Sequence, residues 1–198
     1  MTLFFSLLLL FFPPIEEVIP EGPFSYPGKS SREVIIVDPN HAPLLEEATQ
    51  TLFQQVEKDI LNNVISLIQE ELFDLELSNE IELWELLGKQ ETFPEVSLEV
   101  FLDAKIGVCR HFALTASYLI EQLIREGVLK GEVFLIREDT PFGRHAWTLF
   151  LSEHSAWHLD AYWGVLENGK TDAGFSKLCH KYGMRVMQKQ KLRWENEH

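Results

Sequence analysis

Three residues in the middle of the chain have the types that nucleophilic amide chemistry uses: Cys109, His145 and Asp160. A cysteine thiolate attacks a carbonyl carbon, a histidine moves the proton to the leaving group, and a carboxylate orients the histidine ring. Each residue alone has an ordinary explanation, since a lone cysteine is more often a small buried core residue than a nucleophile. Their occurrence together, in the order Cys, His, Asp, predicts a catalytic triad.

The residues after Cys109 predict an amphipathic helix that begins at Cys109 itself. Apolar residues recur at three- and four-residue steps over this stretch: Phe112, Ala113, Ala116, Leu119, Ile120, Leu123 and Ile124. Gly107 offers a turn before Cys109, and Gly127 is placed to end the helix. The unpaired N–H groups and the positive dipole at a helix N-terminus favour a thiolate and can donate to an oxyanion. The sequence therefore predicts an activated thiol.

Three strand-like runs follow the helix, at residues 132–137, 145–151 and 157–162. Side chains alternate between the faces of a strand, so the turn after Leu151 decides whether His145 and Asp160 share a face. A two-residue turn makes them directly opposed, and a four-residue loop makes them diagonal neighbours. A three-residue loop sends them to opposite faces. We expect one of the two registers that allow contact, with Trp147 and His158 on the same face, bordering the site.

Three short motifs carry a resemblance to a known family: GVCRHFA at residues 107–113, HAW at 145–147 and WHLD at 157–160. Together, over residues 97–163, they resemble the transglutaminase-like superfamily. The resemblance implies a papain-like α+β fold, with N-terminal helices and with the nucleophile helix packed on a small antiparallel sheet that carries His145 and Asp160. It also implies a thioester intermediate formed from a protein or peptide substrate. The reaction would end in amide hydrolysis, glutamine deamidation or transfer to an amine.

Two residues beside the triad, Arg110 and Trp147, are candidates for substrate binding. A basic residue is not what the first turn of a helix favours, so Arg110 can bind a substrate carboxylate, with an internal salt bridge as an equal alternative. The tryptophans of this region can line a substrate groove or pack in the core: Trp147, Trp157 and Trp163. His111 points about 200° around the helix from Cys109 and is expected to be structural. A second oxyanion donor has no clear counterpart, and Trp84 and Gln90 are guesses.

Cysteine and histidine also suit a zinc site, which would need Cys109, His111, Cys179 and His180. The Cys-x-His and Cys-His spacings do not match the usual gaps between zinc ligands, so we expect no metal. The sequence contains neither a Gly-rich phosphate loop nor a calcium-loop pattern, and we expect no cofactor. Two cysteines are few for a disulfide-stabilised scaffold, so we treat them as separate thiols.

Residues 1–40 differ in composition from the rest of the chain. Residues 3–12 are an apolar run that is too short to cross a bilayer as a helix, so we expect no integral membrane association. A signal-peptide core, a segment docked on the protein body and a misassigned start explain the run about equally well, with a cytoplasmic location slightly favoured over export. Residues 13–40 are a Pro-rich connector in which residues 33–38 predict one strand. We expect a single catalytic domain over residues 41–198.

The remaining pattern is mostly helical. Residues 43–72 predict one long amphipathic helix or two in line, residues 81–87 a second helical stretch closed by Gly88, and residues 97–104 a short helix capped by Ser97. Acidic residues crowd residues 70–85, which we interpret as solvated helix faces. The basic residues of 181–193 are interpreted as a basic last strand or tail.

The formal net charge of −14 would repel a nucleic-acid backbone, so nucleic-acid binding is disfavoured. Two alternatives to a simple enzyme stay open. The first is a catalytically silent binding or assembly module, motivated by the missing second oxyanion donor. The second makes the acidic helix of residues 43–73 a partner-binding surface alongside a working site. The oligomeric state is left open.

Overall fold

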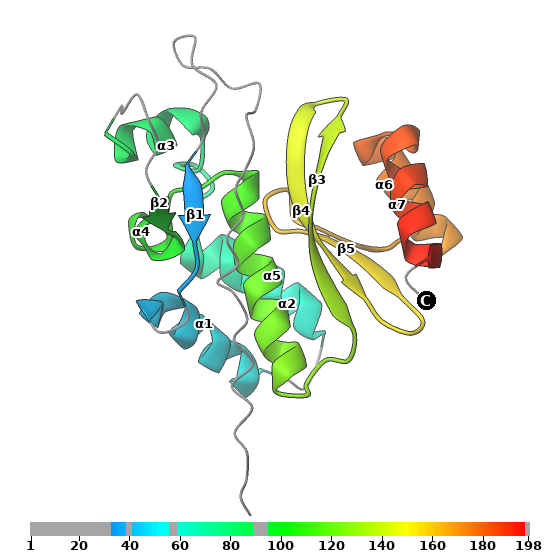
Figure 1. Ribbon diagram of the computed structural model, residues 1–198, viewed down its shortest axis with the longest axis horizontal. Coiled ribbons are helices and arrows are strands. Elements are labelled where there is room, and N and C mark those ends of the chain that lie inside the picture. The colour runs from blue at the N-terminus through cyan, green and yellow to red at the C-terminus, as the bar shows by residue number, and fades with distance from the viewer. Residues whose placement is uncertain (1–32, 39–40, 56–58, 89–94, 197–198) are drawn as a thin grey trace, which may run out of the picture.

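The structure, a computed structural model, describes residues 33–38, 41–55, 59–88 and 95–196. It is an α+β protein, 53% helix and 21% strand, with a small antiparallel sheet, which confirms the predicted class. Figure 1 shows three layers: the N-terminal helices, the sheet, and two C-terminal helices. None of the helices in these ranges is both long and apolar enough to span a bilayer. The apolar residues 3–12, most of the Pro-rich connector and Gln90 lie outside the described residues.

The sheet is an antiparallel meander in the strand order β3-β4-β5-β6. Its strands are β3 (Glu132–Thr140), β4 (Gly143–Leu151), β5 (Ala156–Asp160) and β6 (Val165–Asn168). Leu151 pairs with Ala156, so four residues form the loop, and His145 and Asp160 become diagonal neighbours on one face. The three predicted strands are confirmed, whereas β6 was not predicted. The register is the second of the two that allow contact.

Helix α5 (Cys109–Arg125) packs against β3, β4 and β5. It begins and ends as predicted, with Gly127 in the left-handed region at φ 75°. Thr148 of β4 donates to the Ala113 carbonyl at 2.9 Å and bonds the Ser117 hydroxyl at 3.0 Å. All three positions are buried, so this polar bridge has no competing water and fixes the helix against the strand.

Helices α1 (Pro43–Gln54) and α2 (Ile60–Leu67) both pack against α5, and α2 also contacts β5. A π-helical turn, Ile68–Leu72, follows α2 directly. The described residues therefore form two separate helices here and not one long helix. Their apolar residues are buried in a core shared with α5: Leu45, Ala48, Leu52, Leu61, Val64, Leu67 and Ile68. This burial removes the alternative in which residues 43–73 offer an apolar partner-binding face.

A small parallel pair joins the start of the described chain to its middle. Strand β1 (Val34–Ile36) pairs with β2 (Glu95–Ser97), in the register Val34 to Glu95. The short helices of this region are α3 (Glu80–Leu86), capped by the Asn79 side chain, and α4 (Leu98–Ala104), capped by the Ser97 hydroxyl as predicted. Residues 33–38, which the sequence assigned to the connector, place Ile35 and Val37 in the folded core.

Helices α6 (Asp172–Tyr182) and α7 (Met184–Asn196) cover the other face of the sheet. Side chains of the sheet and of the two helices form one apolar cluster there. The strands β3, β4 and β5 contribute Ile136, Trp147, Leu149, Leu151 and Ala156, and the helices contribute Leu178, Tyr182, Met187 and Trp194. The prediction of a basic last strand or tail at residues 181–193 is wrong. The buried positions follow helical spacing, which the many basic residues on the outer face obscure: Tyr182, Val186, Met187, Gln190 and Trp194.

Candidate active site

Cys109 is the first residue of α5, and close packing just before it sets its position. A Cβ atom at Gly107 would lie 2.6 Å from Cε1 of Phe73, so the backbone passes this ring more closely than a larger residue allows. Val108 is extended, and its N–H donates to Nδ1 of His111 at 3.1 Å. At the first helical position, the Cys109 N–H has no acceptor within its own helix. Cys109 is thus a half-buried thiol at a helix N-terminus.

His145 and Asp160 are joined by a short hydrogen bond, with 2.6 Å between Nε2 and Oδ2. Their side chains are 5% and 1% exposed, respectively. Since Nε2 faces Asp160, Nδ1 is the ring nitrogen left for the Cys109 thiol, whose pKa is lowered by its interaction with His145. The three predicted triad residues therefore lie together, with His145 between the thiol and the carboxylate.

Three groups hold the Asp160 carboxylate. Besides His145, the Tyr182 hydroxyl donates to Oδ2 at 2.6 Å, and the Trp163 N–H donates to Oδ1 at 3.0 Å. Burial by itself would raise the pKa of Asp160, but the His145 and Tyr182 hydrogen bonds and the His145 charge bring it below its ordinary value. Asp160 is therefore a fixed, ionised acceptor for the histidine.

Trp163 covers one face of the His145 ring. The two ring centroids lie 3.8 Å apart at an interplanar angle of 13°. Because the Trp163 backbone N–H also bonds Asp160, one residue restrains both the imidazole and its carboxylate partner. The ring plane of His145 is thus set by stacking as well as by hydrogen bonding.

The electrostatics of the pair favour charge separation. Burial opposes a thiolate at Cys109, yet its pKa is lowered by the hydrogen bond and charge of His145, the charge of Arg110 and a backbone hydrogen bond from Ala146. Burial also opposes a charged His145, yet hydrogen bonds and charges from Asp160 and Cys109 raise its pKa to about 9. Both pKa shifts therefore act in the direction that favours a thiolate and an imidazolium.

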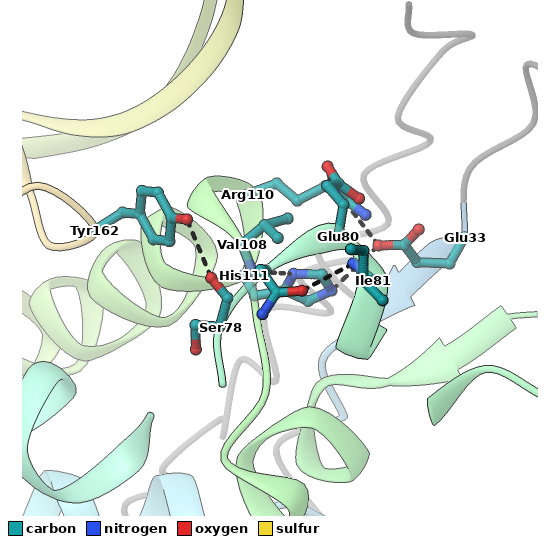
Figure 2. Close-up of polar contacts among 9 residues, drawn as sticks. Glu33, Ser78, Glu80, Ile81, Val108, Arg110, His111 and Tyr162 are labelled. Atoms are coloured by element: carbon teal, nitrogen blue, oxygen red, sulfur yellow. Dashed lines mark hydrogen bonds and ion pairs between the residues drawn. The ribbon is translucent and has the colours of Figure 1, made fainter. Parts of the chain in front are cut away.

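Next to the nucleophile, Arg110 lies in a buried ion-pair cluster, shown in Figure 2. Its Nε donates to Glu33 Oε1 at 2.6 Å and its NH1 to Glu80 Oε1 at 3.2 Å, with the Arg110 and Glu33 side chains only 4% and 2% exposed. Burial disfavours the guanidinium charge, but Glu33 and Glu80 raise the pKa of Arg110 above its ordinary value. Strand β1 is thereby tied to the first turn of α5.

His111 also belongs to this cluster. Its Nε2 lies 3.1 Å from Glu33 Oε1, while its Nδ1 accepts the Val108 N–H, so it bridges the start of α5 to β1. Burial and the charge of Arg110 lower the pKa of His111, although Glu33 acts in the opposite direction. His111 is therefore a neutral ring that accepts a hydrogen bond at Nδ1 and faces a carboxylate at Nε2. Its position is that of a structural residue, as we expected from the sequence.

The predicted partners Trp147 and His158 do share the face of His145 and Asp160. Their rings stack at 4.8 Å, and His158 also packs 4.3 Å from the Tyr182 ring. His158 is fully buried, and neither of its ring nitrogens has a hydrogen-bond partner within the described ranges. Burial lowers the pKa of His158 to about 3, despite the opposing charge of Asp160. His158 is a neutral core residue beneath the triad.

The two expected substrate-binding residues occupy enclosed positions. Trp147 is 1% exposed and lies in the core under α6 and α7, with its ring 6.1 Å from that of His145. Arg110 meets the internal acids Glu33 and Glu80, the salt-bridge alternative for this residue. The structure therefore gives both residues supporting positions around the triad. Of the two guesses for an oxyanion donor, Trp84 is half-buried in α3, and Gln90 is not described.

Three residues of the site have roles that sequence reasoning did not assign: Tyr182, Trp163 and Glu33. Tyr182 follows Asp160 by 22 positions, so no local signal connects the two. Glu33 lies 77 positions before Arg110, in a segment that composition alone identifies as a connector. Trp163 had a local signal, since an aspartate followed by a turn often accepts backbone N–H groups of that turn.

Among the described residues, no three His, Cys, Asp or Glu side chains lie together as a metal site. Cys179 and His180 lie on α6, where the Cys179 thiol contacts Met184 Sδ at 3.5 Å. Burial raises the pKa of Cys179, the opposite of the shift at Cys109. Both cysteines are free thiols.

Comparison of the chain with protein-family models, curated proteins and solved structures finds no match. Any functional conclusion therefore rests on the residues and geometry described above.

Proposed function

We propose that this chain is a thiol-dependent acyl-transfer enzyme of the transglutaminase-like type with a papain-like fold. It acts on an amide of a protein or peptide substrate through a thioester on Cys109. The observation that supports this proposal is the arrangement of a Cys109 thiol at a helix N-terminus, with its pKa lowered by His145, and of a His145 ring hydrogen-bonded to the buried Asp160. Nucleophilic amide chemistry needs these three groups in this order.

In the first step, the Cys109 thiolate attacks the amide carbonyl carbon, and the carbonyl electron pair moves onto oxygen. His145 then donates its proton to the amide nitrogen, the C–N bond breaks, and the amine leaves. A thioester and a neutral His145 remain. Asp160 keeps the ring in place while its charge changes, because its carboxylate is held by Tyr182 and Trp163 as well.

In the second step, neutral His145 takes a proton from water or from an acceptor amine. The oxygen or nitrogen of that molecule attacks the thioester carbon, the C–S bond breaks, and the thiolate returns. Water gives hydrolysis or deamidation, and an amine gives a new amide. The proton left on His145 restores the resting ion pair.

Two backbone groups are available to the oxyanion. Cys109 and Arg110 occupy the first two positions of α5, where N–H groups have no acceptor within the helix. Such groups at a helix N-terminus can donate to the negative oxygen that forms beside the sulfur.

Iodoacetamide labelling followed by peptide mass spectrometry tests this proposal without knowledge of the substrate. Cys109 should react much faster than Cys179 at neutral pH, because the two thiols have opposite pKa shifts. His145→Ala should slow labelling of Cys109 and leave Cys179 unchanged. A chromogenic acetyl ester should likewise leave an acetyl group on Cys109 in the unchanged protein and not in Cys109→Ala.

Equal, slow labelling of the two cysteines, with no effect of His145→Ala, would contradict the proposal. It would leave the alternative of a catalytically silent transglutaminase-like module. Under that alternative, Cys109→Ala should retain every biological activity of the protein.

A further inference from the structure

Beyond the triad, an open hollow of about 470 Å³ lies on the surface beside it, lined by Phe142, Trp163, His180 and Lys181. These residues come from three places: the turn between β3 and β4, the segment after β5, and the last turn of α6. We propose that this hollow is a substrate subsite for an aromatic side chain of an acyl-donor peptide that carries a carboxylate next to that side chain. The inference rests on the proposed function, since it identifies the substrate class of the same site.

The hollow lies close to the ring of His145. Trp163, which lines it, stacks on the catalytic imidazole with ring centroids 3.8 Å apart. A ligand that contacts Trp163 is therefore one ring away from His145. The Trp163 backbone is also held by Asp160, so this wall of the hollow keeps a fixed position relative to the triad.

The lining has the chemistry of an aromatic receptor. Phe142 is 74% exposed at the tip of the β3–β4 hairpin, and its ring meets that of Trp163 edge to face, at 6.2 Å and 88°. An exposed phenylalanine adds little to the stability of the fold, since its burial against the core is small. Two aromatic rings at right angles leave an apolar corner into which a third ring can pack.

The charge of the hollow selects the second feature of the ligand. The Lys181 ammonium lies 5.1 Å from the Trp163 ring centroid, and it has no carboxylate partner among the described residues. Its neighbour on the same helix, Lys177, is paired with Glu167 at 2.7 Å. On a chain of net charge −14, a positive group without an acid beside an apolar corner is complementary to a peptide carboxylate.

Binding is measured with full-length Cys109→Ala, so that no acyl transfer occurs, by fluorescence anisotropy of labelled peptides. The probe peptide contains glutamine flanked by phenylalanine and glutamate. Three matched peptides replace phenylalanine by alanine, glutamate by glutamine, or glutamate by lysine. We expect the probe to bind best, with a loss of about tenfold for the alanine peptide and about fivefold or more for the lysine peptide.

Substitutions of the residues that line the hollow test whether the probe peptide binds there. In the same background, Phe142→Ala and Lys181→Gln should each weaken the probe about fivefold or more, and Lys181→Gln should abolish the preference for glutamate over glutamine. The controls are Lys177→Gln, a lysine of the same helix, and Leu192→Ala, a 61% exposed apolar residue of α7. Both controls should bind the probe as the background does.

The outcomes separate this subsite from the proposed function, because iodoacetamide labelling of Cys109 is measured independently in the unchanged protein. Fast labelling with no probe binding, or with equal binding of all four peptides, overturns the subsite and leaves the enzyme proposal standing. Probe binding that Phe142→Ala and Lys181→Gln do not weaken also overturns it. The expected binding pattern with slow labelling retains the peptide site and contradicts the enzyme.

Discussion

Two histidines on the same face of the sheet respond to burial in opposite ways. Burial alone would lower the pKa of either ring, yet hydrogen bonds to Asp160 and Cys109 raise that of His145 to about 9. The ring of His158, two residues before Asp160, has no hydrogen bond in the described part of the chain, and burial lowers its pKa to about 3. The partners of each ring, rather than its depth, decide its charge.

The first prediction concerns the pH dependence of Cys109. Because the pKa of His145 is about 9, its imidazolium is present across neutral pH and lowers the pKa of Cys109, so we expect iodoacetamide labelling to change little over this range. In Asp160→Asn, the loss of the carboxylate charge lowers the pKa of His145, and Cys109 reverts toward the thiol. We expect labelling at pH 7 to slow by about tenfold or more, measured at Cys109 from pH 5 to pH 10.

The matched control for this prediction is Asp172→Asn, which changes an exposed acid at the start of α6. Its labelling profile should superimpose on that of the unchanged protein. An Asp160→Asn profile that also superimposes would show that the carboxylate does not govern the pair.

The second prediction concerns His158 and stability. Since the folded pKa of about 3 lies below the ordinary 6.5, the unfolded chain binds more protons between these values. The neutral ring therefore has no titration penalty above pH 6.5, and stability is lost as the pH falls from 6.5 toward 3. At pH 5 this loss should be about 2 kcal/mol, and His158→Leu should remove it.

Urea unfolding at pH 7 and pH 5 measures this effect. At pH 7, His158→Leu should match or exceed the unchanged protein by about 1 kcal/mol, because two buried nitrogens without partners are removed. His154→Gln, at a site 86% exposed, is the control and should keep the original difference between the two pH values. A His158→Leu variant as acid-sensitive as the unchanged protein would contradict the assignment.

At the scale of elements, the N-terminal half of α5 is held from both sides. Thr148 bonds the helix to β4, and Arg110 bonds it to Glu33 next to β1. Cys109 is the first residue of this held helix, so elements that do not touch the reacting atoms still set where the sulfur lies. Buried polar bridges of this kind define one arrangement of helix and sheet.

The third prediction compares two glutamates that share Arg110. Glu33→Gln leaves a 4% exposed guanidinium without its closest charge partner and should destabilise the fold by about 3–5 kcal/mol. Glu80→Gln is the matched control, because its side chain is 32% exposed and 3.2 Å away, and it should cost about 1 kcal/mol or less. Guanidinium chloride unfolding measures both, and equal losses would contradict the difference in role.

The elements that sequence predicted well carry their signals locally. The spacing of apolar residues after Cys109, the glycine at 127 and the Ser97 cap each act within a few residues, and the structure has those boundaries. The loop between β4 and β5 could not be fixed, because loops of two and four residues both keep His145 and Asp160 on one face. Helix α7 escaped prediction because its apolar positions are few among charged ones.

At the scale of the whole molecule, the sheet is enclosed between two helical layers that reach the triad from opposite sides. Helix α5 supplies the thiol, and α6 supplies Tyr182 to the carboxylate. Contacts of this range have no signature in a sequence motif. The three residues of the proposed triad could be named from the sequence, whereas the residues that hold them could not.

The fourth prediction tests the C-terminal layer. A chain that ends at Lys170 lacks α6 and α7 and leaves the sheet residues Trp147, Leu149 and Leu151 uncovered. We expect it to lose cooperative unfolding and fast Cys109 labelling together, since an uncovered apolar face of this kind destabilises a domain. A chain that ends at Trp194, a buried residue near the end of α7, is the control and should keep both. Fast labelling in the shorter chain would contradict the role of this layer.

The ion pair between Glu33 and Arg110 spans 77 positions of sequence, and this distance has a consequence for the order in which the protein matures. Closing so long a loop is entropically unfavourable and belongs to the late part of folding, after local helices and hairpins have formed. The buried anchor at the start of α5 is therefore completed late, after the helix itself has formed. The position of this end of the helix becomes fixed only once strand β1 has docked.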